Sequence, residues 1–447
     1  MVRQGTSFWK AGFYASDITP PAGIHLAGFA LRRQGCLGVL DRLYARALCL
    51  DDGHRRCLLI SCDVLGFDAH DAEAIRAALS RKTGIPVSHI LLAATHTHSG
   101  PAIMRTHGIG ERDPEFCKWL FARILETGHQ ASRRLFRATL ELHRGTIRIG
   151  INRRGSIPPG SIHPVPDPDG PYDDILALLH VKPRNRNSTP IVAFHCACHP
   201  TVLGETNRHI SADFPGQVIG QLRKAGFNSL FFNGAAGNIN PRATGSYREV
   251  EATGKAVARQ ILALLQHPGE TLLPELHAEN RVLPVRYAEL PSLQTCERLI
   301  RDMERQRHGA AQESERLLHT LRLQWVRNMR AALEAGRLPS RVEAPLQVIG
   351  IGALRLAALP FEVFAETALA LYAASRQPLW VCGYANGNFG YLPPADAFEQ
   401  GGYEVAEAYK FYNHPAPFAP EAEAGVRQCI LEMVQTGGQS TVNGTGS

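Results

Sequence analysis

Two histidine-containing segments stand where apolar, strand-like stretches end. The first reads THTHSG at 95–100 and follows the apolar run ILLAA. In an extended chain, side chains two residues apart lie on one face, so His96 and His98 would project together. Two neutral imidazoles side by side suit zinc or another divalent metal. A pair of partly buried, hydrogen-bonded histidines is the alternative interpretation.

The second segment, HCACHPT at 195–201, also ends an apolar run. The same alternation would place His195 and His199 on one face, with Cys196 and Cys198 on the other. The apolar residues before His195 favour a core position for it, which makes His199 the better candidate ligand. No CxxC pair is present to complete a thiolate site.

Strand-like and helix-like stretches alternate along the chain, which predicts an α/β fold. We expect mixed β-sheets flanked by helices, with the metal site in loops at strand ends. Segment 43–63 reads as two strands, and PFEVFAETALALYAASRQ, from Pro360, reads as a helix with an acidic first turn. The charged region 290–337 predicts a helical excursion with a break near His308-Gly309. The loop 156–174 and this excursion are candidates for a rim or lid around a cleft.

Composition indicates a soluble globular protein. Of 447 residues, 44% are hydrophobic, and the net charge is +7 without a dense basic run, so nucleic acid is not an expected partner. The ten cysteines stand mostly in apolar stretches, as reduced core thiols do. We see neither a signal peptide nor a transmembrane segment and expect a cytoplasmic protein.

Several motifs, taken in order, resemble the catalytic domain of the neutral/alkaline non-lysosomal ceramidases. They run from residue 12 to about 405 and read FYASDITPPAGIHLAGFA, DRLYARAL, ISCDVLG, THTHSGP, GINRRGS, HPTVLGETNRHISADFPG, FFNGAAGNINP, LPFEVFAETA and GYLPPADAFEQGGYE. The resemblance implies a zinc amidohydrolase that cleaves an N-acyl amide bond. It implies one domain over 1–435, followed by a tail over 436–447 that we expect to be disordered because it lacks apolar side chains.

The resemblance also implies site residues. One zinc per chain would be held by His96, His199, Glu362 and Tyr391. From its position alone, Glu362 could instead be an acidic residue favoured by a helix N-terminus, and Tyr391 an ordinary packed tyrosine.

The supporting catalytic residues implied by the resemblance are His98, Arg153 and Tyr403. Arg153 could be a surface ion-pair residue, or Arg154 could take its place. Family members carry a serine where this chain has Asn240, so we expect attack by metal-activated water rather than by a serine. Ceramidases also continue into a β-sandwich domain, which this sequence does not include.

Three functions remain compatible with the sequence. The favoured one is hydrolysis of a small-molecule or lipid N-acyl amide, either ceramide-like or smaller, within sphingolipid or related lipid metabolism. The second is a metal-dependent esterase, or a hydrolase of another carbonyl or phosphoryl substrate, at the same site. The third is a non-catalytic metal-binding protein. Because no basic amphipathic segment stands out for membrane docking, we expect a preference for shorter or more soluble amides. The sequence leaves the oligomeric state open.

Overall fold

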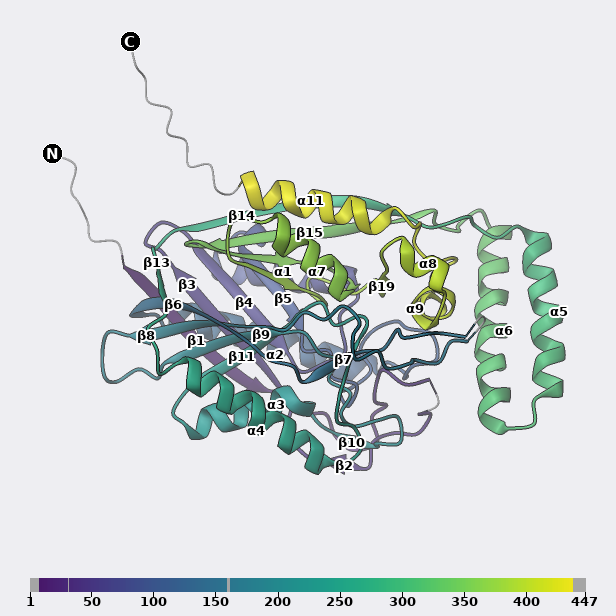
Figure 1. The fold of residues 1–447 in the computed structure, drawn as a ribbon, viewed down its shortest axis with the longest axis horizontal. Helices are drawn as coiled ribbons and strands as arrows, with labels where there is room; N and C mark the ends of the chain where they lie inside the picture. Colours follow the sequence, from purple (N-terminus) through teal and green to yellow (C-terminus); the bar gives the residue numbers. More distant parts are fainter. Residues whose placement is uncertain (1–7, 31, 159–160, 437–447) are drawn as a thin grey trace, which may run out of the picture.

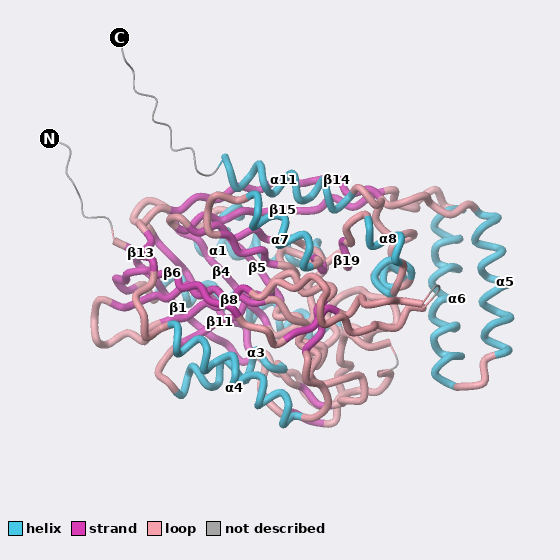
Figure 2. The backbone as a smooth tube through the Cα atoms, viewed as in Figure 1, coloured by secondary structure: helices cyan, strands magenta, loops and turns pink. Residues whose placement is uncertain are grey.

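Two β-sheets lie face to face between layers of helices (Figure 1). The computed structural model describes residues 8–30, 32–158 and 161–436. Figure 2 separates the strands of the sheets from the helices outside them and from the long loops at one end. The architecture confirms the predicted α/β fold with mixed sheets flanked by helices.

The larger sheet has nine strands in the order β11-β9-β8-β6-β1-β3-β4-β5, with β13 beside β6. The pairs β4–β5 and β9–β11 are parallel and the other pairs are antiparallel. The strands are β1 (Trp9–Asp17), β3 (Tyr44–Asp51), β4 (Arg56–Cys62), β5 (Ile90–Ala94), β6 (Phe136–Thr146), β8 (Ile175–Pro183), β9 (Ile191–Cys196), β11 (Asn228–Asn233) and β13 (Glu270–Leu272). The two strands predicted within 43–63 are β3 and β4.

The smaller sheet has the order β14-β15-β16-β18 and packs on one face of the larger sheet. Its strands are β14 (Leu276–Arg286), β15 (Arg341–Ile351), β16 (Leu354–Ala358) and β18 (Leu379–Cys382). Leu59 and Leu91 of the larger sheet share one buried cluster with Ile349 and Trp380 of the smaller. Successive strand residues point to opposite faces, so Leu58 and Ile60 face the helices instead.

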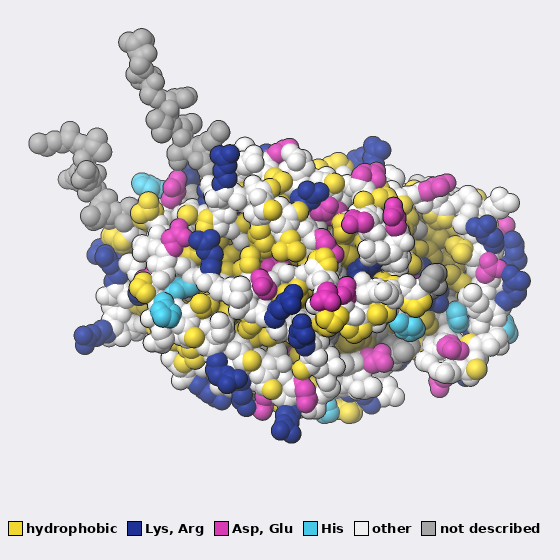
Figure 3. All heavy atoms as spheres, in the orientation of Figure 1, with side chains coloured by type: hydrophobic (Ala, Val, Ile, Leu, Met, Phe, Trp, Pro, Cys, Tyr) yellow, Lys and Arg dark blue, Asp and Glu magenta, His cyan; other side chains and the backbone are white. Residues whose placement is uncertain are grey.

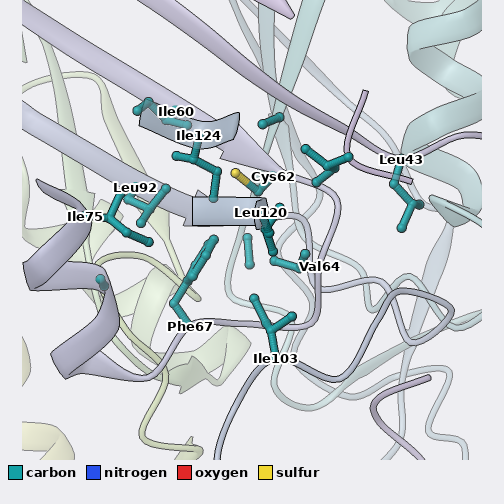
Figure 4. Close-up of a cluster of buried hydrophobic side chains, with 14 of the residues drawn as sticks. Leu43, Ile60, Cys62, Val64, Phe67, Ile75, Leu92, Ile103, Leu120 and Ile124 are labelled. Atoms are coloured by element: carbon teal, nitrogen blue, oxygen red, sulfur yellow. The ribbon is translucent and has the colours of Figure 1, made fainter. Parts of the chain in front are cut away.

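Helices cover the outer faces of both sheets. On the larger sheet lie α1 (Ala69–Thr83), α2 (Pro114–Arg133), α3 (Asp213–Lys224) and α4 (Tyr247–Leu264), and on the smaller lie α7 (Ala365–Ala374) and α11 (Ala422–Thr436). Figure 4 shows the cluster beneath α1 and α2, where Ile75, Leu120 and Ile124 meet Ile60 and Leu92 of the sheet. This buried apolar layer holds the ends of β4 and β5 in place.

A helical hairpin made of α5 (Leu293–Gly309) and α6 (Glu313–Glu334) projects at one end of the molecule (Figure 1). Met303, Val326 and Met329 are buried between its two helices. The predicted excursion over 290–337, with its break near Gly309, is therefore confirmed as two helices. The apolar side chains fall at helical spacing on one face of each helix, and the remaining faces are charged.

Short elements surround the end of the sheets where the loops gather. They are β2 (Gly38–Val39), β7 (Gly150–Asn152), β10 (His209–Ile210), β12 (Ile239–Pro241), β17 (Glu362–Val363), β19 (Tyr391–Leu392), the 3₁₀ turn Val87–His89, and the short helices α8 (Asp396–Gln400), α9 (Tyr403–Ala406) and α10 (Ala408–Phe411). The helix predicted from Pro360 begins only at Ala365, since Glu362 pairs with Tyr391 in a parallel two-stranded sheet. That prediction was wrong by about one helical turn.

The outer surface and the cysteines agree with a globular chain. Figure 3 shows basic and acidic side chains interspersed over one face of the molecule. All ten cysteines are free and buried. Within the described residues, each helix is too short or too polar to cross a lipid bilayer. The predicted tail over 436–447 lies outside the described residues, except that Thr436 is the last residue of α11.

Candidate metal centre

The two edge strands of the larger sheet approach each other, although they stand at opposite ends of the strand order. Ser61 of β4 donates from Oγ to the carbonyl oxygen of Phe231 in β11 at 2.5 Å. Asn233, at the end of β11, donates from Nδ2 to the carbonyl oxygen of Thr95 at 3.3 Å. This closure brings the loop after β5 beside the loop after β9, so the two histidine segments meet.

Three imidazoles converge at this point. One ring nitrogen each of His96, His98 and His199 lie within 4.8 Å of one another. The Nε2 atoms of His96 and His98 are 3.3 Å apart. β5 ends at Ala94, and His96 has a left-handed backbone with φ of 70°. The expected meeting of His96 and His98 is found, but the extended strand proposed as its cause is not.

Glu362 places one carboxylate oxygen against two of these rings. Its Oε2 is 3.2 Å from Nε2 of His96 and 3.2 Å from Nε2 of His199. Its Oε1 accepts a hydrogen bond from the hydroxyl of Tyr412. Burial opposes ionisation of Glu362, but the neighbouring imidazoles of His96 and His199 hold the carboxyl pKa well below its usual range.

Backbone carbonyls orient the histidine rings. Nδ1 of His96 contacts the carbonyl oxygen of Leu65 at 2.6 Å, and Nδ1 of His199 contacts that of Ala236 at 2.5 Å. A carbonyl only accepts, so each Nδ1 carries the proton and each Nε2 presents its lone pair to the centre. Burial, followed by the charge of Arg153, lowers the pKa of His199 to about 4, which favours the neutral ring that binds metals.

Arg153 connects the predicted ligand Tyr391 to a buried acidic residue. Its Nη2 donates to the hydroxyl of Tyr391 at 3.0 Å, and its Nε donates to Oε1 of Glu404 at 2.7 Å. Its Nη1 donates to Oδ1 of Asn240 at 3.0 Å. Arg154 also binds Glu404, but its second amino group donates to the carbonyl oxygen of Gly401 at 2.7 Å. Of the two arginines considered, Arg153 contacts a predicted ligand.

Tyr403 stands at the start of α9 and completes the predicted set. Its ring lies edge-on to the ring of Tyr391, with 5.8 Å between centroids. Tyr403, Tyr391 and His98 are partly exposed, whereas His96, His199 and Glu362 are at most 1% exposed. The partly exposed group therefore forms the side of the centre that a substrate can reach. All seven predicted site residues gather in one region, and their individual roles stay predictions.

His195 lies away from the centre, in the core between the two sheets. Its ring stacks on Trp380 with 5.4 Å between centroids and an 8° angle, and its Nδ1 contacts the carbonyl oxygen of Phe232 at 3.1 Å. The preference for His199 over His195 as the residue at the centre therefore agrees with the geometry.

Three residues at the centre were missed by the sequence analysis. Tyr412 donates to Glu362, Glu404 binds Arg153, and Tyr384 stacks on His96 with 3.8 Å between ring centroids. Glu404 directly follows Tyr403, which was the one available signal. Tyr412 and Tyr384 stand in no pattern that sequence spacing would single out.

The donor set fits a zinc ion. One nitrogen each of His96 and His199 faces the same carboxylate oxygen of Glu362. The hydroxyl of Tyr391 lies beside the guanidinium of Arg153, whose positive charge favours the ionised tyrosine. Burial raises the pKa of Tyr391 well above its ordinary value and the charge of Arg153 opposes this, so phenolate ligation would need a cation. His98 is a further nitrogen donor within reach, and its buried Nδ1 has no hydrogen-bond partner in the part of the chain that the structure describes.

Comparisons with known proteins agree with this arrangement. Residues 9–223 match the family described as neutral/alkaline non-lysosomal ceramidase, N-terminal. The neutral ceramidase of Pseudomonas aeruginosa is 26% identical over 251 residues, which cover 52% of this chain and 37% of that protein. The match thus spans little more than a third of that relative's length.

Solved structures share the fold. The crystal structure of neutral ceramidase from Pseudomonas aeruginosa superposes with a TM-score of 0.73 at 19% identity, covering 96% of this chain and 74% of that one. A ceramidase structure complexed with C2 gives a TM-score of 0.73 at 18% identity, covering 96% of this chain and 75% of that one. These structures confirm the fold, and the match over residues 9–223 confirms the predicted family resemblance.

Proposed function

We propose, from the premise that this chain is a member of the neutral/alkaline non-lysosomal ceramidase family through its N-terminal domain, that it is a zinc-dependent hydrolase of N-acyl amide bonds. The observation that carries the proposal is the convergence of His96 and His199 on one oxygen of Glu362, beside Arg153 and Tyr391. We propose His96, His199, Glu362 and Tyr391 as the ligands of one zinc ion. Bound zinc would supply Lewis acidity, polarising the scissile carbonyl and lowering the pKa of water.

His98 is the proposed acid–base group. Burial, followed by the neighbouring imidazoles of His96 and His199, holds its pKa well below the usual histidine value, so the ring is neutral and can accept a proton from water. Water adds its oxygen to the acyl carbon, and the carbon–nitrogen bond then breaks. The proton taken up by His98 passes to the departing amine, and a carboxylic acid and an amine are the products.

Arg153 and Tyr403 are the proposed donors to the oxygen on which negative charge develops. Arg153 is 7% exposed and held on two further sides, by Glu404 and by Asn240, so its orientation is set before substrate arrives. Asn240 stands where family members carry a serine, and its side-chain oxygen is occupied by Arg153. That contact supports attack by water in place of a serine nucleophile.

Replacing His98 with alanine, or Tyr403 with phenylalanine, should slow turnover while zinc stays bound. A positioned acid–base group contributes roughly 10²–10⁴-fold, so we expect losses in kcat of that order for His98→Ala. Zinc content by elemental analysis and steady-state kinetics on one amide check this. Asn240→Ala is the companion variant: it should cost less, because Glu404 still holds Arg153. If His98→Ala kept the kcat of the parental protein, His98 would have no acid–base role. If Asn240→Ala lost as much kcat as His98→Ala, Asn240 would be a catalytic residue that this scheme lacks.

The substrate is proposed to be a shorter or more soluble amide than long-chain ceramide. On the face shown in Figure 3 the charged side chains are interspersed, which supports this, because an anionic membrane attracts clustered basic residues and gives about 1 kcal/mol for each one well placed. We expect kcat/KM to fall with acyl-chain length in a series of N-acyl amides, without gain from anionic vesicles. Highest activity on long-chain ceramide, enhanced by vesicles, would contradict this prediction.

The two alternative functions are tested with the same protein. Esters with the same acyl groups distinguish an esterase from an amidase, and no hydrolysis of either substrate by zinc-loaded protein would favour a non-catalytic role.

A further inference from the structure

A second cluster of metal-binding side chains lies on the larger sheet, apart from the centre described above. Glu141 and His143 are two residues apart in β6, and His180 of β8 stands directly opposite Glu141. Side chains with this spacing lie on the same face of a sheet. One donor atom from each of the three lies within 4.8 Å of the others. No residue of this cluster belongs to the first centre.

Both histidines of the cluster are buried and each has a ring nitrogen without a partner. His143 and His180 are 5% and 8% exposed. Nε2 of His143 and Nδ1 of His180 have no hydrogen-bond partner among the described residues. A buried polar atom left unpaired is destabilising, so two of them within one cluster need an explanation. The two rings are 5.7 Å apart between centroids.

Glu141 is arranged so that one oxygen stays available. Its Oε1 accepts from Nζ of Lys182 at 2.7 Å, while its Oε2 lies 3.5 Å from Nε2 of His143. The lysine therefore fixes the carboxylate without covering the oxygen that faces the histidines. The side chain of Lys182 is 47% exposed, so it can also move into solvent.

The loop after α4 packs closely on His143. A β-carbon at Gly269 would lie 2.7 Å from Nε2 of His143 and 2.9 Å from both ring carbons next to it, closer than real contacts allow. Glycine at this position therefore lets the imidazole keep its place beside Glu141 and His180. Burial lowers the pKa of His143, and burial with the charge of His143 lowers that of His180 to about 4.

We propose that Glu141, His143 and His180 form a second site for a divalent transition ion, with zinc as the probe ion. Two imidazole nitrogens and one carboxylate oxygen are a donor set used for zinc, and the ion would satisfy both orphan nitrogens. It would tie β6 to β8 beneath the loop at Gly269. The site sits in the middle of paired strands, so its role is structural.

The test is zinc stoichiometry by elemental analysis and calorimetric titration of metal-stripped protein. The parental protein should bind two zinc ions, and the His199→Ala variant should bind one, at the second site. Adding His143→Ala to His199→Ala should weaken the remaining site at least about 100-fold, because loss of even a supporting residue costs 10–100-fold. His308→Ala, which changes an exposed histidine of the α5–α6 hairpin, is the control and should change nothing.

Two variants test the site without removing a ligand, in case His143→Ala does not fold. Gly269→Ala should weaken the second site, because the added β-carbon would push the His143 ring out of its place. Lys182→Gln should tighten it severalfold, because the amide can still donate to Oε1 of Glu141 while a neighbouring positive charge is removed. A single zinc in the parental protein that His199→Ala removes, or a second zinc insensitive to Gly269→Ala and Lys182→Gln, would overturn the proposal. These outcomes concern stoichiometry alone, so they are independent of whether the first centre hydrolyses amides.

Discussion

Replacing His199 with alanine is expected to abolish metal binding at the first centre and hydrolysis together. His199 supplies one of the two Nε2 atoms that face Oε2 of Glu362, and its ring is held by the carbonyl oxygen of Ala236. A catalytic metal ion supplies several kcal/mol of transition-state stabilisation, so the loss in kcat/KM should be roughly 10³-fold or more. Zinc content and kinetics on the best amide measure the two effects.

His195→Ala is the matched control for that variant. His195 is also a buried histidine from the same segment, but it stacks on Trp380 in the core. Its loss should lower the free energy of unfolding and leave metal content unchanged. Full retention of zinc at the first centre in His199→Ala, or loss of zinc in a folded His195→Ala, would show that the ligand was assigned to the wrong residue.

Replacing Glu404 with alanine is expected to destabilise the fold and slow catalysis at once. Its two oxygens bind Arg153 at 2.7 Å and Arg154 at 2.5 Å, and all three side chains are at most 8% exposed. Removing one partner of a buried ion pair costs about 3–5 kcal/mol, because the remaining charge stays buried and unpaired. Chemical denaturation measures this cost. The loss of orientation of Arg153 should also lower kcat.

Glu343→Ala provides the comparison on the surface. Glu343 pairs with Arg341 at 2.7 Å, but both side chains are about half exposed, at 53% and 52%. Exposed pairs contribute about 0–1 kcal/mol, so this variant should unfold close to the parental midpoint. If Glu404→Ala cost as little as Glu343→Ala, the buried cluster of Arg153, Arg154 and Glu404 would not hold the site together.

The sequence predicted the parts of the site that follow strand ends. His96 and His199 could be selected because each comes just after an apolar run, and the core position of His195 followed from its apolar neighbours. Glu362 and Tyr391 could not be selected this way. They lie in two-residue strands that pair with each other, and so short a pairing leaves no periodic signal. For these two residues the family resemblance was necessary.

The contacts between distant segments were beyond sequence reasoning. The approach of β11 to β4, through Ser61 and Phe231, depends on how the whole sheet curls. Tyr412 reaches Glu362 across 50 positions of the chain, and Glu404 reaches Arg153 across 251. The α5–α6 hairpin, in contrast, was predictable because its pattern is local. Amphipathic spacing and a glycine break are enough to specify two adjacent helices.

The dispersal of the first centre along the chain has a consequence for the order of folding. His96 and His199 leave the ribosome long before Glu362, Tyr391 and Tyr403, so a nascent chain exposes two imidazoles without their anionic partners. The entropy cost of closing such long loops comes before the contacts that offset it, so assembly of the centre is slow. A metal ion that binds the finished centre and not the open chain would then stabilise the native state by mass action. The metal would then bind late in folding, and it would link segments from the first and the last thirds of the chain.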